Sequence, residues 1–378
     1  MRESSRQASF RSSPNRRDAL PKRRLERTNR SHREDFHLSW SSVLIARRTP
    51  NVLTLFRFLS RRGFCSCCAV AASRAVNRRW LLPAEAYAEA RDIVDTIRDA
   101  AATAPLQLHK LRGNVTVIEG SGGNIAVLTG ADGKVFVDAG IAATRPRVLD
   151  AANSLSQDPI KHLINTHWHF DHTDGNQWLN EQGAAILAHE NTHKHLLAAQ
   201  RVEDWEYNFP SPPLAAVPTE VFSSEKTVRL NRSTLRLKYY GPAHTDSDIS
   251  VTFSEADIFH CGDTYWNGFY PFIDYSTGGS IDGMIKATDT NIAAVGSQTI
   301  VIPGHNLPDR ASPVSNKAEL TSYREMLVAI RENVAKFKRQ GRSLDETIAA
   351  KPTGAFDARW GQFLITPALF TKLVYEGV

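Results

Sequence analysis

Cysteine is scarce in this sequence, and so are long apolar segments. Only four of the 378 residues are cysteines, and three of them fall together at Cys65, Cys67 and Cys68. These three lack the paired spacing, with a second pair further along, that is typical of a cysteine metal site. The mildly apolar run that holds them, residues 65–72, is far too short to span a bilayer. We therefore expect no membrane span.

Acidic residues are scarce at the N-terminal end. Residues 1–62 hold 16 Lys and Arg against 5 Asp and Glu, whereas the remainder holds 30 against 35. Residues 1–79 also show no sustained apolar period, so they cannot bury a core and are expected to form a disordered Arg-rich tail. A nucleic-acid-binding arm is the functional alternative for such a tail. The net negative charge of the remainder argues against a nucleic-acid substrate.

The end of this tail resembles a twin-arginine export signal. An arginine pair, Arg61 and Arg62, precedes the weakly apolar run, and small residues offer cleavage sites after Ala71 or Ala75. We expect the signal over about residues 52–75, which would direct the protein to the periplasm or outside the cell. If the pair belongs only to an Arg-rich linker, the protein stays in the cytoplasm.

The composition from about residue 80 onward is that of a globular enzyme, so we expect one domain over residues 80–378. The Pro-rich residues 209–218 predict a long surface loop that acts as a flap over a pocket. Elsewhere, strand patterns bracketed by helical patterns indicate an α/β layered fold. The predicted strands are 115–118, 124–128, 135–137, 160–164, 227–230, 235–239, 249–253, 258–260 and 299–302, and the predicted helices are 83–101, 147–155, 176–182, 281–295 and 316–339.

Three histidines and an aspartate lie within six positions, directly after the predicted strand 160–164. Side chains alternate along an extended segment, which puts His167 and His169 on one side. The turn that follows can bring Asp171 and His172 toward them. Neutral imidazole and carboxylate suit zinc or iron. Without a metal, four such groups packed together would repel one another or leave polar atoms without partners. The string therefore predicts a metal site.

Further candidate ligands stand at tight turns beside other predicted strands. His244 lies in the sequence Gly-Pro-Ala-His-Thr, Asp263 in Cys-Gly-Asp and His305 in Pro-Gly-His. Asp138 follows the predicted strand 135–137 in the same way. Side chains at strand ends can converge over one edge of a sheet, so these residues are expected to meet the histidine string.

This ordered set resembles the metallo-β-lactamase superfamily across essentially all of the chain after about residue 110. The resemblance implies a four-layer αβ/βα sandwich, with two facing sheets, outer helices and a dinuclear site along one edge. It implies two zinc ions per chain, with iron or manganese as alternatives. Asp138 would orient the ligand loop through hydrogen bonds. By motif, one metal would be held by His167, His169 and His244, the other by Asp171, His172 and His305, and Asp263 would bridge them.

The activity that the resemblance implies is metal-dependent hydrolysis. Two metals lower the pKa of a bridging water to give hydroxide at neutral pH, and one of them polarises the scissile carbonyl. Asp171 would be the catalytic residue that orients the hydroxide and passes its proton to the leaving group. The expected substrate is a small-molecule ester, thioester, lactone or cyclic amide. The alternatives are a mononuclear iron dioxygenase of persulfides, a true β-lactamase, and a binding module with a degenerate site, although no ligand position is degenerate.

The set departs from the best-known zinc β-lactamases, in which a cysteine stands at the bridging position. Asp263 occupies that position here, and the pattern is more similar to glyoxalase-II-type thioesterases and lactonases. Cys261 lies two residues earlier, where strand alternation need not bring it to the metal, so we interpret it as structural. Aromatic residues near the ligands predict an apolar pocket for an acyl or ring group. The pocket residues named from the sequence are Trp168, Phe170, Trp266 and Tyr270.

Overall fold

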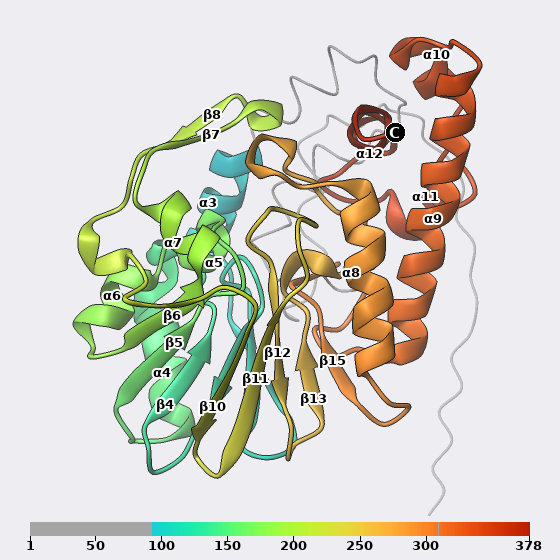
Figure 1. Cartoon of the computed structure of the whole chain (residues 1–378). Coiled ribbons are helices and arrows are strands. Elements are labelled where there is room, and N and C mark those ends of the chain that lie inside the picture. Colours follow the sequence, from blue (N-terminus) through green and yellow to red (C-terminus); the bar gives the residue numbers. More distant parts are fainter. Residues whose placement is uncertain (1–92, 309) are drawn as a thin grey trace, which may run out of the picture. The chain divides into compact units, whose positions relative to one another are not determined.

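The computed structural model describes residues 93–308 and 310–378. The predicted tail, the export signal and the start of the predicted domain lie outside these residues. Within them, two β-sheets face each other and helices cover their outer sides (Figure 1). The predicted α/β fold, a four-layer sandwich, is confirmed.

The first sheet has seven strands in the order β1-β2-β3-β4-β5-β6-β9. Strands β1 to β4 pair antiparallel, whereas β4, β5, β6 and β9 pair parallel. The bounds are β1 Gln107–Lys110, β2 Val115–Glu119, β3 Ile125–Leu128, β4 Lys134–Val137, β5 Ile160–Ile164, β6 Ala185–His189 and β9 Glu220–Phe222.

The second sheet has five strands in the order β10-β11-β12-β13-β15, antiparallel except for the parallel pair of β13 and β15. Its bounds are β10 Glu225–Leu230, β11 Ser233–Tyr239, β12 Ile249–Phe253, β13 Ile258–His260 and β15 Ile300–Ile302. Two short pairs complete the described strands: β7 Gln200–Val202 with β8 Tyr207–Phe209, and β14 Trp266–Asn267 with β16 His305–Asn306.

Helices form the outer layers. Figure 1 shows α4 and α6 beside the first sheet, and α8 and α9 beside the second. None of the helices in the described ranges is long and apolar enough to cross a membrane. Their bounds are α3 Ile93–Thr103, α4 Arg145–Leu155, α5 Phe170–Thr173, α6 Asn176–Glu181, α7 Glu190–Leu196, α8 Ile281–Ala294, α9 Lys317–Arg339, α10 Leu344–Ala349, α11 Asp357–Trp360 and α12 Pro367–Glu376.

Strand β4 shows why the chain forms layers. Its side chains alternate between two apolar clusters, because successive residues of a strand face opposite sides. Val135 and Val137 pack with the inner face of the second sheet, whereas Phe136 packs with residues of α4 and α6. Full burial of each such side chain contributes about 1.5–3 kcal/mol. A strand that is apolar on both faces therefore belongs in the middle of the sandwich.

The parallel strand pairs set the position of the candidate site. In the first sheet Val137 of β4 pairs with Ile164 of β5, and in the second His260 of β13 pairs with Ile302 of β15. The carboxyl ends of paired parallel strands reach the same edge. The loops that follow these four strands carry Asp138, the histidine string, Asp263 and His305, and they meet at one edge of the sandwich.

Candidate metal centre

All seven predicted ligands are brought together at this edge. In three groups, the candidate ligand atoms lie within 4.8 Å of one another. We call the first the three-histidine group and the second the mixed group; the third group connects them through Asp263. The members are His167, His169 and His244 in the first, Asp171, His172 and His305 in the second, and His167, His172 and Asp263 in the third.

Backbone and side-chain partners fix two rings of the three-histidine group. Nδ1 of His244 lies 2.8 Å from the carbonyl oxygen of Phe272, so this nitrogen donates and Nε2 is left for a ligand. Nδ1 of His167 lies 3.1 Å from the hydroxyl of Thr166. Its Nε2 is buried and has no hydrogen-bond partner. Both rings therefore turn an Nε2 lone pair toward the group.

Asp274 fixes the third ring, and no local sequence pattern marks this residue. Its Oδ2 lies 3.0 Å from Nε2 of His169 and accepts a hydrogen bond of 2.6 Å from the Thr277 hydroxyl. Although burial opposes ionisation, the contact with His169 keeps the pKa of Asp274 below its usual value. The proton on Nε2 leaves Nδ1 of His169 facing His244, whose Nε2 is 2.8 Å away. A carboxylate behind a metal-binding histidine orients the ring and raises its basicity.

Asp138 orients a histidine of the mixed group in the way that Asp274 orients His169. Its Oδ2 lies 2.8 Å from Nδ1 of His172, which leaves Nε2 of His172 for a ligand. The same carboxylate accepts hydrogen bonds from the backbone N–H and the hydroxyl of Thr166. Asp138 has a left-handed backbone with φ of 66°, which Asp tolerates better than most residues. This side chain thus lies behind the ligands, where the resemblance placed it.

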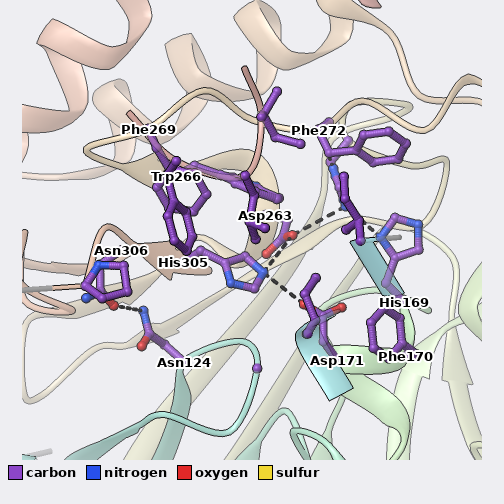
Figure 2. Close-up of a pocket in the computed structure, with 18 of the residues that line it drawn as sticks. Asn124, His169, Phe170, Asp171, Asp263, Trp266, Phe269, Phe272, His305 and Asn306 are labelled. Atoms are coloured by element: carbon purple, nitrogen blue, oxygen red, sulfur yellow. Dashed lines mark hydrogen bonds and ion pairs between the residues drawn. The ribbon is translucent and has the colours of Figure 1, made fainter. Parts of the chain in front are cut away.

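Asp263 lies between the two groups, on the short turn η4, Gly262–Thr264. Its Oδ1 is 3.1 Å from Nε2 of His172, and its Oδ2 is 3.3 Å from Nε2 of His305 and 3.4 Å from Nε2 of His244. The backbone of Gly304 lies so close that a Cβ there would overlap Oδ1 of Asp263. Figure 2 shows Asp263, His305 and Asp171 turned toward one another.

The electrostatics of the two groups differ. Burial lowers the pKa of His244 to about 4, and it holds that of His167 well below its usual value. Burial would also lower the pKa of His305, but the charges and hydrogen bonds of Asp263 and Asp171 outweigh it and raise the pKa to about 9. The histidines in turn lower the pKa of Asp171 to about 2, against the effect of its burial. Asp171 is therefore ionised at neutral pH.

The donor set fits divalent metal ions. A buried polar atom without a partner costs about 1–3 kcal/mol. Nε2 of His167 and Oδ1 of Asp263 are two such atoms, and both face the shared ligand groups. Imidazoles and carboxylates without thiolates are donors for zinc or iron. Cys261 is buried, belongs to none of the three groups, and has a pKa raised by burial, as a structural cysteine would.

A pocket, here called the central pocket, opens over the ligands (Figure 2). Phe170 and Trp266 line it as predicted. The prediction was wrong for Trp168 and Tyr270, which lie outside its lining. The indole of Trp168 donates to the Thr277 hydroxyl at 3.1 Å, and the hydroxyl of Tyr270 donates to Asp357 at 2.9 Å. Buried Trp and Tyr turn their polar atoms toward such partners, which sets the direction of the ring.

Several lining residues were not predicted. They come from α3, from the end of β2 and the loop after it, from the turn before β8, from β16 and from the segment before α12. The predicted flap, residues 209–218, does not line the central pocket; Phe209 instead stacks on Phe170 from behind, with ring centroids 5.5 Å apart. The additional lining residues include Ile93, Ile97, Glu119, Asn124, Trp205, Asn306, Phe363, Leu364 and Ile365.

Known proteins resemble parts of this chain. A hydroxyacylglutathione hydrolase of Rhodospirillum rubrum is 28% identical over 159 residues, which is 42% of this chain and 52% of that protein. A metallo-beta-lactamase type 2 of Pseudomonas aeruginosa is 30% identical over 103 residues, 27% of this chain and 36% of that protein. The matches thus span about half and about a third of these relatives.

The solved structure of a stereoselective inverting sec-alkylsulfatase from Pseudomonas sp. superposes with a TM-score of 0.52, covering 82% of this chain and 61% of that one. At 12% identity it shows the fold alone. The model of the metallo-beta-lactamase superfamily matches residues 118–335, a range that holds all seven candidate ligands and Asp138. This match covers more than half of the chain, which therefore belongs to the metallo-β-lactamase superfamily of metal-binding, hydrolase-like enzymes.

Proposed function

We propose that this protein is a dinuclear zinc hydrolase that cleaves an ester, thioester, lactone or cyclic amide of a small molecule. The observation that carries the proposal is the position of Asp263, whose carboxylate oxygens lie 3.1–3.4 Å from His172, His305 and His244. One carboxylate thus reaches both ligand groups, as a bridging ligand must.

The three-histidine group would hold one ion and the mixed group the other, with Asp263 shared. Bound there, the ions would polarise the scissile carbonyl and activate a water molecule near neutral pH. Phe272 through its carbonyl, Asp274 and Asp138 hold the imidazoles in the required orientation. The protein's contribution is a set of donors that needs little rearrangement on binding.

Asp171 is the proposed proton carrier. Its carboxylate lines the central pocket and lies 3.2 Å from Nε2 of His305. The pKa of about 2 keeps Asp171 ionised at neutral pH, and the ionised carboxylate has the lone pairs that can accept a proton from the attacking water. It can then give that proton to the leaving group. Phe170 and Trp266 line the pocket beside Asp171 and give this side of it an apolar surface.

Metal analysis and a substrate panel test the proposal together. The zinc-loaded protein should hold close to two zinc ions per chain and should hydrolyse at least one of a set of esters, thioesters, lactones and β-lactams. One iron per chain with oxygen uptake on persulfides would instead establish the dioxygenase alternative. Hydrolysis confined to β-lactams would establish the β-lactamase alternative.

Export is a separate proposal that rests on the arginine pair Arg61 and Arg62 and the small residues after it. The signal would be removed, so the mature protein should begin after Ala71 or Ala75. N-terminal sequencing of the protein from its native host tests this. Active cytoplasmic protein that begins at Met1 or Arg2 would contradict it.

A further inference from the structure

We infer that the central pocket selects substrates whose acyl group is apolar and uncharged, of aryl or medium-chain alkyl size, and that it rejects acyl groups with a charged end. The inference rests on the proposed hydrolase function, because it names the substrate class of the same site. It concerns the part of the substrate that lies away from the bond to be cleaved.

The far wall of the central pocket is apolar. Trp205 stacks on Phe272, with ring centroids 4.4 Å apart, and Phe170 packs nearby. The stretch Phe363–Ile365 and two isoleucines of α3 also line the pocket, and the Phe363 ring packs against Phe269 with centroids 5.1 Å apart. Of the described residues that line the pocket, none is Lys or Arg. A carboxylate or phosphate at the end of an acyl group would therefore find no Lys or Arg side chain among these residues to pair with.

Arg98 is close to this wall but does not supply such a cation. Its guanidinium lies 5.0 Å from the centroid of the Phe170 ring, and its Nη1 donates to the Tyr207 hydroxyl at 2.6 Å. Arg98 lines a separate surface pocket, of which Phe170 is also a wall. The Phe170 ring thus separates the charge of Arg98 from the central pocket.

The opposite wall is polar, and it does not invite an anion either. Figure 2 shows Asn124 and Asn306 on the side away from Phe170 and Phe272. Glu119 accepts a hydrogen bond of 2.7 Å from Asn306 and lies 2.8 Å from Nε2 of His109. This wall offers two amides and a carboxylate that already has partners. A negatively charged group placed there would face Glu119.

Segments outside the family match contribute part of the apolar lining. The superfamily match ends at residues 118 and 335, whereas Ile93, Ile97 and Phe363–Ile365 lie outside it. The seven candidate ligands lie inside it. The apolar region that would hold the acyl group is therefore built partly by Phe170, Trp205 and Phe272, inside the match, and partly by two segments that the match does not cover.

Burial of a charge explains the expected selectivity. Moving an unpaired charge from water into an apolar wall costs far more than moving a methyl group, whatever the sign of the charge. An acyl group with a charged end should therefore react more slowly whether it carries a carboxylate or a primary ammonium group, since both are strongly hydrated in water. A lower kcat/KM for both the negatively and the positively charged substrate would indicate an apolar wall. Attraction or repulsion by the ligand groups would instead lower the rate for one sign of charge and raise it for the other.

Three para-nitrophenyl esters of equal length test this on the zinc-loaded full chain. They are the hexanoate, the adipate half ester with a terminal carboxylate, and the 6-aminohexanoate with a terminal ammonium group. With each kcat/KM divided by the uncatalysed rate, both charged esters should fall about a hundredfold or more below the hexanoate. A loss of less than about tenfold for either charged ester would overturn the inference.

A charge introduced into the wall should change the preference. Leu364, a partly buried lining residue, is the position of choice, and Leu364→Lys should raise the adipate-to-hexanoate ratio about tenfold by pairing the carboxylate. Leu197→Lys is the matched control, because Leu197 is 51% exposed and lies outside the lining. If Leu364→Lys does not fold, Ile97→Lys makes the same test from α3. An unchanged ratio in a folded wall variant would contradict the inference.

Binding separates failure of this inference from failure of the proposed function. The anilides of the same three acids can be titrated by tryptophan fluorescence, since Trp205 and Trp266 line the pocket. Preference for the uncharged anilide without hydrolysis of any substrate would support the pocket inference while removing the hydrolase proposal. Equal affinity for all three anilides would overturn the pocket inference even if esters are cleaved.

Discussion

The three-histidine group and the mixed group lie side by side, yet protons compete with a metal very differently in each. In the first, burial lowers the pKa of His244 to about 4, so the ring is neutral over the physiological range. In the second, carboxylates raise the pKa of His305 to about 9, so without a metal this ring holds a proton. Burial lowers the pKa of both rings, and only the carboxylates around His305 outweigh it. These carboxylates therefore decide that a metal must displace a proton from His305 but not from His244.

The two groups also differ in their access to solvent. The side chain of His244 is almost fully buried, whereas that of His305 is 15% exposed at the wall of the central pocket. We therefore expect the three-histidine group to hold its ion more firmly, and the mixed group to be the place where water and substrate arrive. Asp263 is the shared residue on which both depend.

Removal of the shared carboxylate should have the largest effect. Asp263→Ala leaves neither group with its bridging oxygen, so the protein should lose at least one metal ion, and activity should fall about a thousandfold or more, roughly 4 kcal/mol. Metal analysis and kcat/KM measure both effects. Cys261→Ser is the matched control two residues away and should keep its metal. Loss of metal in the Cys261 variant but not in the Asp263 variant would show that Cys261, and not Asp263, is the ligand shared by the two groups.

Asp171→Asn should affect the mixed group alone. The amide keeps one oxygen that can bind a metal but cannot accept a proton, so turnover should fall about a hundredfold or more. Metal content should fall much less, because the three-histidine group is untouched. Parallel measurements of kcat and metal content decide the point. Equal proportional losses of both would mean that Asp171 serves only as a ligand.

The two carboxylates behind the histidines allow a matched pair of variants. Asp274→Asn weakens the support of His169, and Asp138→Asn weakens that of His172. Each should lower metal affinity about 10–100-fold at its own group and leave the other group nearly unchanged. Asn also tolerates the left-handed backbone at position 138. Chelator competition resolves the first and second ions, and identical behaviour of the two variants would contradict the distinction between the groups.

Acidification should release the two ions in order. Because His305 must lose a proton to bind, affinity at the mixed group should fall about tenfold for each pH unit below 9. Affinity at the three-histidine group should change much less between pH 9 and 7, because burial keeps His244 and His167 neutral in this range. Dialysis at stepped pH with metal analysis should therefore show two separate losses. Release of both metal ions at the same pH would contradict the proposed difference in proton competition between the two groups.

The same shifts act on the stability of the metal-free protein, with opposite signs. The pKa of His305 is raised above 6.5, so its stabilising contribution is complete below pH 6.5 and is lost as the pH rises to about 9. The pKa of His244 is lowered, so its contribution is complete above pH 6.5 and is lost as the pH falls to about 4. Thermal unfolding of both single His→Ala variants across pH 4–9 measures the two contributions.

The sequence predicted the features that depend on local order. All nine predicted strands have counterparts in the structure, and His244, Asp263 and His305 follow strands at turns that Gly or Pro marks in the sequence. Asp274 could not be predicted, because its partner His169 lies 105 positions away and the contact depends on how two rings are turned. Trp168 and Tyr270 were misplaced for a related reason. Their position near ligands is local, whereas the direction of each ring is set by Thr277 and Asp357 far along the chain.

Gly304 restricts which mutational routes are open to this site. The amide of Gly304 donates to the carbonyl of Gly262 at 2.9 Å, so the two loops that carry His305 and Asp263 are joined backbone to backbone. Even alanine at position 304 would push the Asp263 carboxylate aside. In a library randomised at this position, sequences with all seven ligands intact would still be inactive unless glycine is kept. A search for relatives with the same centre should therefore require glycine at position 304 as strictly as it requires any ligand.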